Sequence, residues 1–94
     1  MSQSLLSNAT ADTTGTAVSV SGPATIWVRG DFDGAKVEIQ SSVDNVSANF
    51  RTVGLLAQIT AEGEYNSVRY GAHYLRAKLL SAGTSTDLDV SVSQ

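Results

Sequence analysis

The sequence predicts an all-β fold: a small antiparallel β-sandwich of jelly-roll or immunoglobulin-like type with seven to eight short strands. Apolar and polar residues alternate with a period of two in several segments, and Gly, Pro, Asp and Ser clusters separate these segments. The turn signals recur about every 8–14 residues, which is typical of a sandwich or small barrel. We therefore expect residues 1–94 to form a single β-sandwich domain.

The stretch at residues 23–40 carries the strongest pattern. Ala24, Ile26 and Val28 fall on one face of a first strand, and Ala35, Val37 and Ile39 fall on one face of a second. The connection at residues 30–34 is rich in Asp and Gly, the residues of hairpin turns. We expect these two strands to form an antiparallel hairpin.

The N-terminal region, residues 1–22, is rich in Ser, Thr and Ala. Residues 1–15 are an extended arm in one interpretation. In the other, Leu5 and Leu6 belong to an edge strand at residues 3–7, followed by a loop at residues 12–15. Alternation predicts a further strand at residues 16–21, which ends before Pro23.

The C-terminal half is predicted to hold a polar loop and four strands. The loop at residues 44–49 is exposed, and Phe50 and Val53 bring it back to the core. Strands are expected at residues 55–60, at residues 65–70 with Val68 and Tyr70 inward, at residues 73–79 and at residues 88–92. A helix at residues 55–61 is the alternative, but the flanking glycines leave it short. The predicted inner face of the sandwich comprises Val18, Val20, Ile26, Val28, Val37, Ile39, Leu75, Ala77, Leu79, Leu88 and Val90.

Composition argues against several classes of function. Six Lys and Arg against nine Asp and Glu provide no basic face for nucleic acid, and no segment has the ~18 apolar residues of a membrane span. The N-terminus lacks a secretion signal, so we expect the protein to be made and assembled in the cytoplasm. With no Cys and one His, disulfides and thiolate metal sites are excluded. Oligomerisation is the remaining common means of stabilising so small a domain.

No catalytic constellation emerges from the titratable residues. His73 lies in the inward register beside Leu75, which favours a hydrogen-bonded structural histidine over a catalytic one. The segment Asp31-Phe32-Asp33-Gly34 resembles the opening of a calcium loop but lacks its later ligands, so a plain turn is favoured. We expect a protein that is not an enzyme, with no catalytic, cofactor-binding or metal-binding residues.

Four segments resemble a family of small β-sandwich virion proteins of tailed bacteriophages, many of which are capsid decoration (cement) proteins. They are LLSNATADTTGTAVSVSGPAT at residues 5–25, DGAKVEIQSSVD at residues 33–44, YLRAKL at residues 74–79 and TDLDVSVSQ at residues 86–94. Where the family pattern has a Trp soon after the Asp turn, this chain has Phe50 after a longer polar loop. The resemblance implies a non-enzymatic protein on the capsid surface, bound to a major capsid protein and to itself as a dimer or trimer. A tail or head-fibre accessory protein is a related alternative.

Trp27 is the residue we expect to anchor a partner. Alternation places it on the outward face with Arg29, and Tyr74 and Arg76 lie outward on another strand. The four residues would form one interface patch if their strands share a sheet, because Trp, Tyr and Arg dominate protein interfaces. Alternatively, Phe50 and the loop at residues 44–49 cover Trp27.

A carbohydrate- or ligand-binding β-sandwich module is the second class of function. In that reading, exposed Trp27 and the tyrosines provide stacking platforms for sugar rings.

Overall fold

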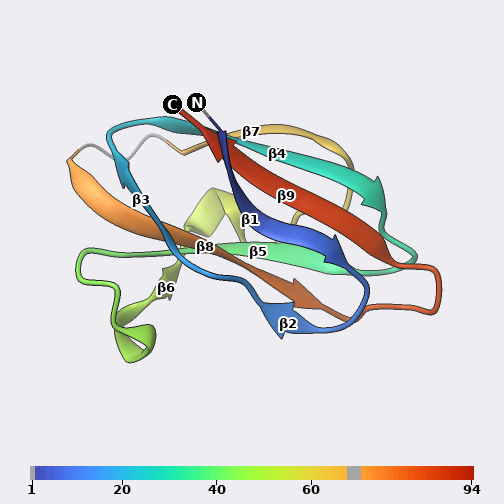
Figure 1. The fold of residues 1–94 in the computed structure, drawn as a ribbon. Helices are drawn as coiled ribbons and strands as arrows, with labels where there is room; N and C mark the ends of the chain where they lie inside the picture. Colours follow the sequence, from blue (N-terminus) through green and yellow to red (C-terminus); the bar gives the residue numbers. More distant parts are fainter. Residues whose placement is uncertain (1, 68–70) are drawn as a thin grey trace.

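Two antiparallel β-sheets pack face to face in the computed structural model, which describes residues 2–67 and 71–94 (Figure 1). Sheet A has the strand order β1 (Ser2–Ala9), β9 (Asp87–Ser93), β4 (Ala24–Asp31) and β7 (Gly63–Ser67). Sheet B has the order β2 (Thr13–Thr14), β8 (Ala72–Leu80), β5 (Lys36–Ser42) and β6 (Arg51–Thr52), and β3 (Val18–Ser21) also pairs with β8. Two 3₁₀ turns, η1 (Ser47–Asn49) and η2 (Gly54–Leu56), lie in the connections. The all-β prediction is confirmed.

The core lies between the two sheets and is formed by the predicted alternation. Ten of the eleven predicted inward residues are buried, and Val18 is half-buried against them. Further buried apolar side chains of this core come from β1, the start of β4, the end of β9 and the connections: Leu5, Leu6, Ala9, Ala24, Ala35, Leu56, Ile59 and Val92. Half-buried Val53 packs against this core, as expected. The expectation that Phe50 does so is wrong, because Phe50 is buried beneath the outward side chain of Arg76, on the other side of sheet B.

The expected hairpin between residues 24–29 and 35–40 is wrong. β4 lies in sheet A between β9 and β7, whereas β5 lies in sheet B between β8 and β6. A tight turn, in which the Ala35 N–H donates to the Phe32 carbonyl at 2.8 Å, carries the chain across to the other sheet. Asp and Gly residues permit this crossover as readily as a hairpin, because both need backbone with positive φ, here at Asp33 and Gly34.

The strand expected at residues 55–60 is also wrong. The 3₁₀ turn η2 occupies the start of this segment, and Ile59 alone forms a bridge, exchanging two 2.9 Å hydrogen bonds with Val37. Leu56 and Ile59, three residues apart, are the buried side chains. Leu56 ends the 3₁₀ turn and Ile59 lies beyond it, at the bridge to Val37, so strand alternation does not decide which residues of this segment face inward.

The N-terminal segment forms the edge strand β1, antiparallel to β9, and Ser2 at its start pairs with Ser93 at the end of β9 (Figure 1). The strand interpretation holds for residues 2–9, so these residues are not a free arm. A register shift between Ser4 and Leu6 lets the consecutive residues Leu5 and Leu6 both face the core, as a β-bulge does.

Three strand boundaries differ from the predictions. The loop expected at residues 12–15 contains the short strand β2, and β3 begins at Val18 instead of residue 16. β7 runs from Gly63 to Ser67, so the predicted inward positions of Val68 and Tyr70 lie outside the described residues. Strands β8 and β9 lie where alternation predicted them.

Truncating a central core residue should strongly destabilise the domain. Ile39 is fully buried in β5, so Ile39→Ala should cost about 2–5 kcal/mol of unfolding free energy in urea denaturation. Ser19→Ala, at an exposed position of β3, is the control and should stay within about 0.5 kcal/mol. Equal effects of the two substitutions would contradict the packing described.

Gly30 should tolerate a side chain far less well than Gly34. Both have positive φ, but a Cβ at Gly30 would lie 2.1 Å from the Asp87 carbonyl oxygen, whereas a Cβ at Gly34 meets nothing within 4 Å. Gly34→Ala should cost about 1–2 kcal/mol from backbone strain alone. Gly30→Ala should cost about 3 kcal/mol or more, because β4 and β9 must also separate. Similar melting temperatures for the two variants would refute this close approach of the strands.

Candidate functional site

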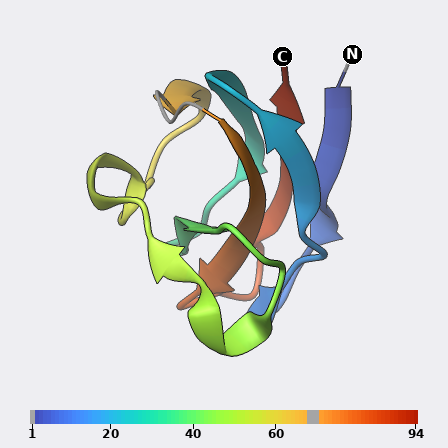
Figure 2. The ribbon, with the colours of Figure 1, turned by 90° about the vertical axis from the view of Figure 1, so that its left-hand side faces the viewer.

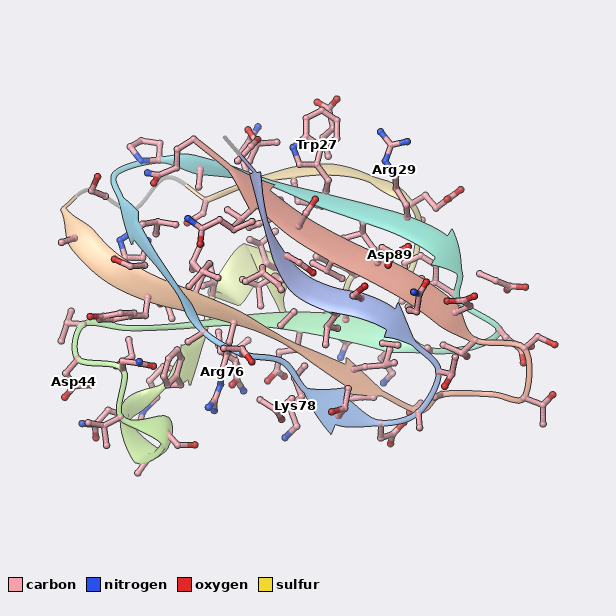
Figure 3. All side chains as sticks on the ribbon, in the orientation of Figure 1. Trp27, Arg29, Asp44, Arg76, Lys78 and Asp89 are labelled. Atoms are coloured by element: carbon pink, nitrogen blue, oxygen red, sulfur yellow. The ribbon has the colours of Figure 1, made fainter. Side chains whose placement is uncertain are left out.

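Trp27 lies in the middle of the outer face of sheet A. Its strand β4 is flanked by β9 and β7, and Trp27 sits opposite Ser91 on one side and Glu64 on the other. The side chain is half-buried, and its indole Nε1–H donates a 2.9 Å hydrogen bond to the Ser93 hydroxyl. Figure 3 shows it projecting away from the sandwich. The hydrogen bond fixes the ring on this face before any partner arrives.

Arg29 extends the same row of outward residues. Its guanidinium carbon lies 5.8 Å from the centroid of the Trp27 ring, within the range of a cation–π contact. Asp89 is its direct neighbour across β9, and the Asp89 carboxylate accepts a 2.8 Å hydrogen bond from the Asn8 N–H. Trp27 and Arg29 therefore form one exposed cluster, as the sequence suggested.

A shallow hollow of about 280 Å³ lies beside this cluster. Its walls are formed by Trp27, Val28, Arg29, Glu62, Gly63 and Glu64. The Glu62 carboxylate accepts a 2.8 Å hydrogen bond from the Gly30 N–H, which holds it against the end of β4. The site thus combines one aromatic platform with a cation and two carboxylates. Such a set suits docking of a polar surface or stacking of a polar ring.

Tyr74 and Arg76 do not belong to this cluster, so the predicted four-residue patch is wrong. They lie on β8, and their side chains face outward from sheet B, whereas Trp27 and Arg29 face outward from sheet A. Figure 3 shows Trp27 and Arg29 on the opposite side of the molecule from Arg76. The two pairs are separated because β4 and β8 belong to different sheets.

Arg76 is occupied within its own chain. Its Nε donates to the Gln40 side chain at 2.7 Å, a terminal nitrogen donates to the Ser47 hydroxyl at 3.1 Å, and the guanidinium stacks 4.1 Å from the Phe50 ring centroid. These contacts attach the loop at residues 43–49, together with Phe50 that follows it, to sheet B. The expectation that this loop covers Trp27 is therefore wrong, because the loop lies on the other sheet.

The loop at residues 43–49 stands out from the body of the domain (Figure 2) and is stiffened by Asp44. The Asp44 carboxylate accepts hydrogen bonds from the Ser42 hydroxyl at 2.7 Å, the Asn49 amide at 2.7 Å and the Val46 N–H at 3.3 Å. These hydrogen bonds lower the pKa of Asp44 below its ordinary 3.8. The bond from Ser42 has the largest effect, and the bond from Asn49 has the next largest.

Val43 and Val46 are features of this loop that sequence reasoning missed. They flank Asp44, and their side chains are 71% and 49% exposed, respectively. Among the described residues, these two are the large apolar side chains that lie exposed. The sequence could have indicated them, because they are apolar residues inside an otherwise polar segment that was predicted to be exposed. Exposed apolar groups on an ordered loop suit contacts with another protein.

The remaining candidates from the sequence are His73 and the segment at residues 31–34. His73 is 2% exposed, and its Nδ1 lies 2.9 Å from the Gly71 carbonyl oxygen, while Nε2 has no partner among the described residues. The predicted inward position of His73 is confirmed, but only Nδ1 has a hydrogen-bond partner among the described residues, where a fully hydrogen-bonded ring was expected. Asp31 accepts the Asp33 N–H at 3.1 Å, and Asp33 accepts the Ser85 N–H at 2.8 Å, as expected of a plain turn.

Within residues 2–67 and 71–94, no group of three or more His, Cys, Asp or Glu side chains is arranged to hold a metal ion. The same residues contain no helix with the length and apolar character needed to cross a membrane.

Comparisons with known proteins add no assignment. No protein-family profile, no curated protein and no solved structure matches this chain.

Acid should loosen the loop at residues 43–49. The hydrogen bonds favour ionised Asp44, so its pKa is lower in the folded chain than in the unfolded chain. The resulting stabilisation is complete above the unfolded value of 3.8 and disappears as pH falls through the lower folded pKa. In an NMR titration, the Val46 N–H and the Asn49 side-chain amide should shift together below pH 3.8.

Asp44→Asn is the control for this titration, since it removes the ionisable group while keeping the shape of the side chain. The joint shift should disappear in that variant. A joint shift that persists without the Asp44 carboxyl would contradict its role in holding the loop.

Proposed function

We propose that this protein is a non-enzymatic structural protein of a tailed-phage virion, a capsid decoration protein that binds the capsid surface through the outer face of sheet A. The observation that carries the proposal is the position of Trp27 in the middle of the outer face of sheet A, where a hydrogen bond to Ser93 fixes its ring. The resemblance of residues 5–25, 33–44, 74–79 and 86–94 to small phage sandwich proteins supports the virion assignment.

Trp27 has the properties of an interface anchor. Tryptophan buries a large area with few rotatable bonds, and anchors of this kind dominate binding energies at protein interfaces. Its bond to Ser93 and its contact with Arg29 already restrict the ring, so binding costs less conformational entropy than ordering a free side chain. The surrounding Thr25, Ser91 and Ser93 are small, which leaves the ring accessible above the sheet.

The second candidate function is carbohydrate binding at the same face. Glu62 and Glu64 line the hollow beside Trp27, so a sugar ring stacked on the indole would meet carboxylate acceptors for its hydroxyl groups. The two candidates differ in their dependence on these carboxylates. Glu64→Gln should abolish glycan binding, measured by calorimetry against a glycan panel, but should alter capsid binding only modestly, as a rim contact does.

Removing the Trp27 ring should impair capsid binding but not folding. Trp27→Ala should weaken binding to purified capsids stripped of this protein by at least ~2 kcal/mol, about 30-fold in Kd. The circular dichroism spectrum should be retained, and the melting temperature should fall by only a few degrees, because the ring lies outside the apolar core.

Tyr74→Ala is the matched control, since it truncates a half-buried aromatic residue at an outward position of the opposite sheet. It should bind capsids with an affinity close to that of the parent protein. If Trp27→Ala unfolds the domain, or if it binds capsids as tightly as the parent, the anchor role is refuted.

A further inference from the structure

Charge is segregated between the two outer faces of the sandwich. Along the outward positions and rim of sheet A, Arg29 is accompanied by five carboxylates: Asp31, Glu62, Glu64, Asp87 and Asp89. Along the outward positions of sheet B, three cations accompany one carboxylate: Lys36, Arg76 and Lys78 with Glu38. The loop that covers part of this face adds a second carboxylate, Asp44, so cations still exceed carboxylates here. Figure 3 shows Arg29 and Asp89 on one side of the molecule and Arg76 and Lys78 on the other. The domain therefore has an acidic face and a basic face.

Two carboxylates of the acidic face lie so close together that they repel each other. Asp31 and Asp87 are direct cross-strand partners on β4 and β9, and like charges in this relation repel each other. Asp31 accepts a hydrogen bond from the Asp33 N–H, and Asp89 accepts one from the Asn8 N–H. Both donors are neutral backbone groups, so these two bonds do not cancel the negative charge. Cations brought by a partner would relieve this repulsion.

The basic face offers such cations on two neighbouring central strands. Lys36 and Lys78 lie on adjacent strands β5 and β8, and both side chains are half-exposed. Lys78 is the cross-strand neighbour of Glu38, whose carboxylate is hydrogen-bonded at 2.6 Å by the Gln40 amide. The strand spacing, about 4.8 Å, is the same on both faces, so rows of opposite charge can align.

We propose that copies of this chain stack head to tail, with the acidic outer face of sheet A on one copy against the basic outer face of sheet B on the next. This deepens the proposed function, and rests on it, by naming a second copy as a partner of the Trp27 face. The molecule measures 38 × 26 × 21 Å, so its broadest outline is comparable with the roughly 800 Å² that each partner buries in a standard interface. Because the two contacting surfaces differ, the contact is heterologous and builds rings or filaments.

The proposal predicts self-association that depends on salt. In sedimentation velocity at about 100 µM protein, the parent chain should form dimers and larger species in 20 mM salt. Raising the salt to about 300 mM should weaken the association at least ten-fold, because screening shortens the range of charge attraction.

Two charge-reversal variants test which faces meet. Glu64→Lys/Asp87→Lys alters the acidic face, and Lys36→Glu/Lys78→Glu alters the basic face; circular dichroism confirms that each still folds. Each variant alone should be monomeric. An equimolar mixture should associate again, because the basic face of the first and the acidic face of the second remain intact.

Two results would overturn the stacking. One is a parent chain that stays monomeric at low salt, and the other is a Lys36→Glu/Lys78→Glu variant that associates as tightly as the parent. The capsid-binding measurement on Trp27→Ala separates these outcomes from failure of the proposed function. A monomeric parent that still binds capsids through Trp27 removes the stacking alone, whereas loss of the Trp27 effect on capsids removes the function.

Discussion

The apolar layer between the two sheets is the constraint on which the rest of the structure depends. Ile26 and Val28 from sheet A meet a layer from sheet B that includes Val37, Ile39 and Leu75, and all of these side chains are fully buried. With neither disulfide nor cysteine available, this layer is the main source of stability among the described residues. It also fixes the outer surfaces, because every second residue of each strand must point away from it. Trp27 and Arg76 consequently lie on opposite sides of the domain.

The local alternation of apolar and polar residues predicted most of the strands and their buried faces, but it did not predict which strands pair with one another. The alternation around Ile26 and Ile39 identified two strands correctly, yet Asp33 and Gly34 serve equally well in a hairpin and in the crossover that the chain makes. The outward position of Trp27 was likewise predictable, whereas its bond to Ser93, 66 residues away, was not. Pairing between distant strands decides which outward residues become neighbours, and no single segment encodes it. At residues 55–61 the helical alternative was set aside because the flanking glycines leave few residues, yet a single 3₁₀ turn, Gly54–Leu56, needs no more.

The two outer faces differ in how the chain itself uses them. On sheet B, Arg76 is engaged by Gln40, Ser47 and Phe50, and the Asp44 loop covers part of the face. Sheet A instead presents Trp27 with its carboxylate-rich surroundings to the exterior. An anchored aromatic residue among charged side chains suits the docking surface that we propose, since the ring would supply affinity and the charges would supply orientation. Both the proposed capsid contact and the proposed stacking use this face.

The fluorescence of Trp27, the only tryptophan of the chain, tests most directly whether this face is the contact surface. The ring is half-exposed in the isolated domain, so acrylamide should quench its emission readily. When the protein is saturated with capsids or driven into assemblies at low salt, the emission should move to shorter wavelength and quenching should fall several-fold. If binding is complete but both the emission wavelength and the quenching stay unchanged, the outer face of sheet A is not the contact surface.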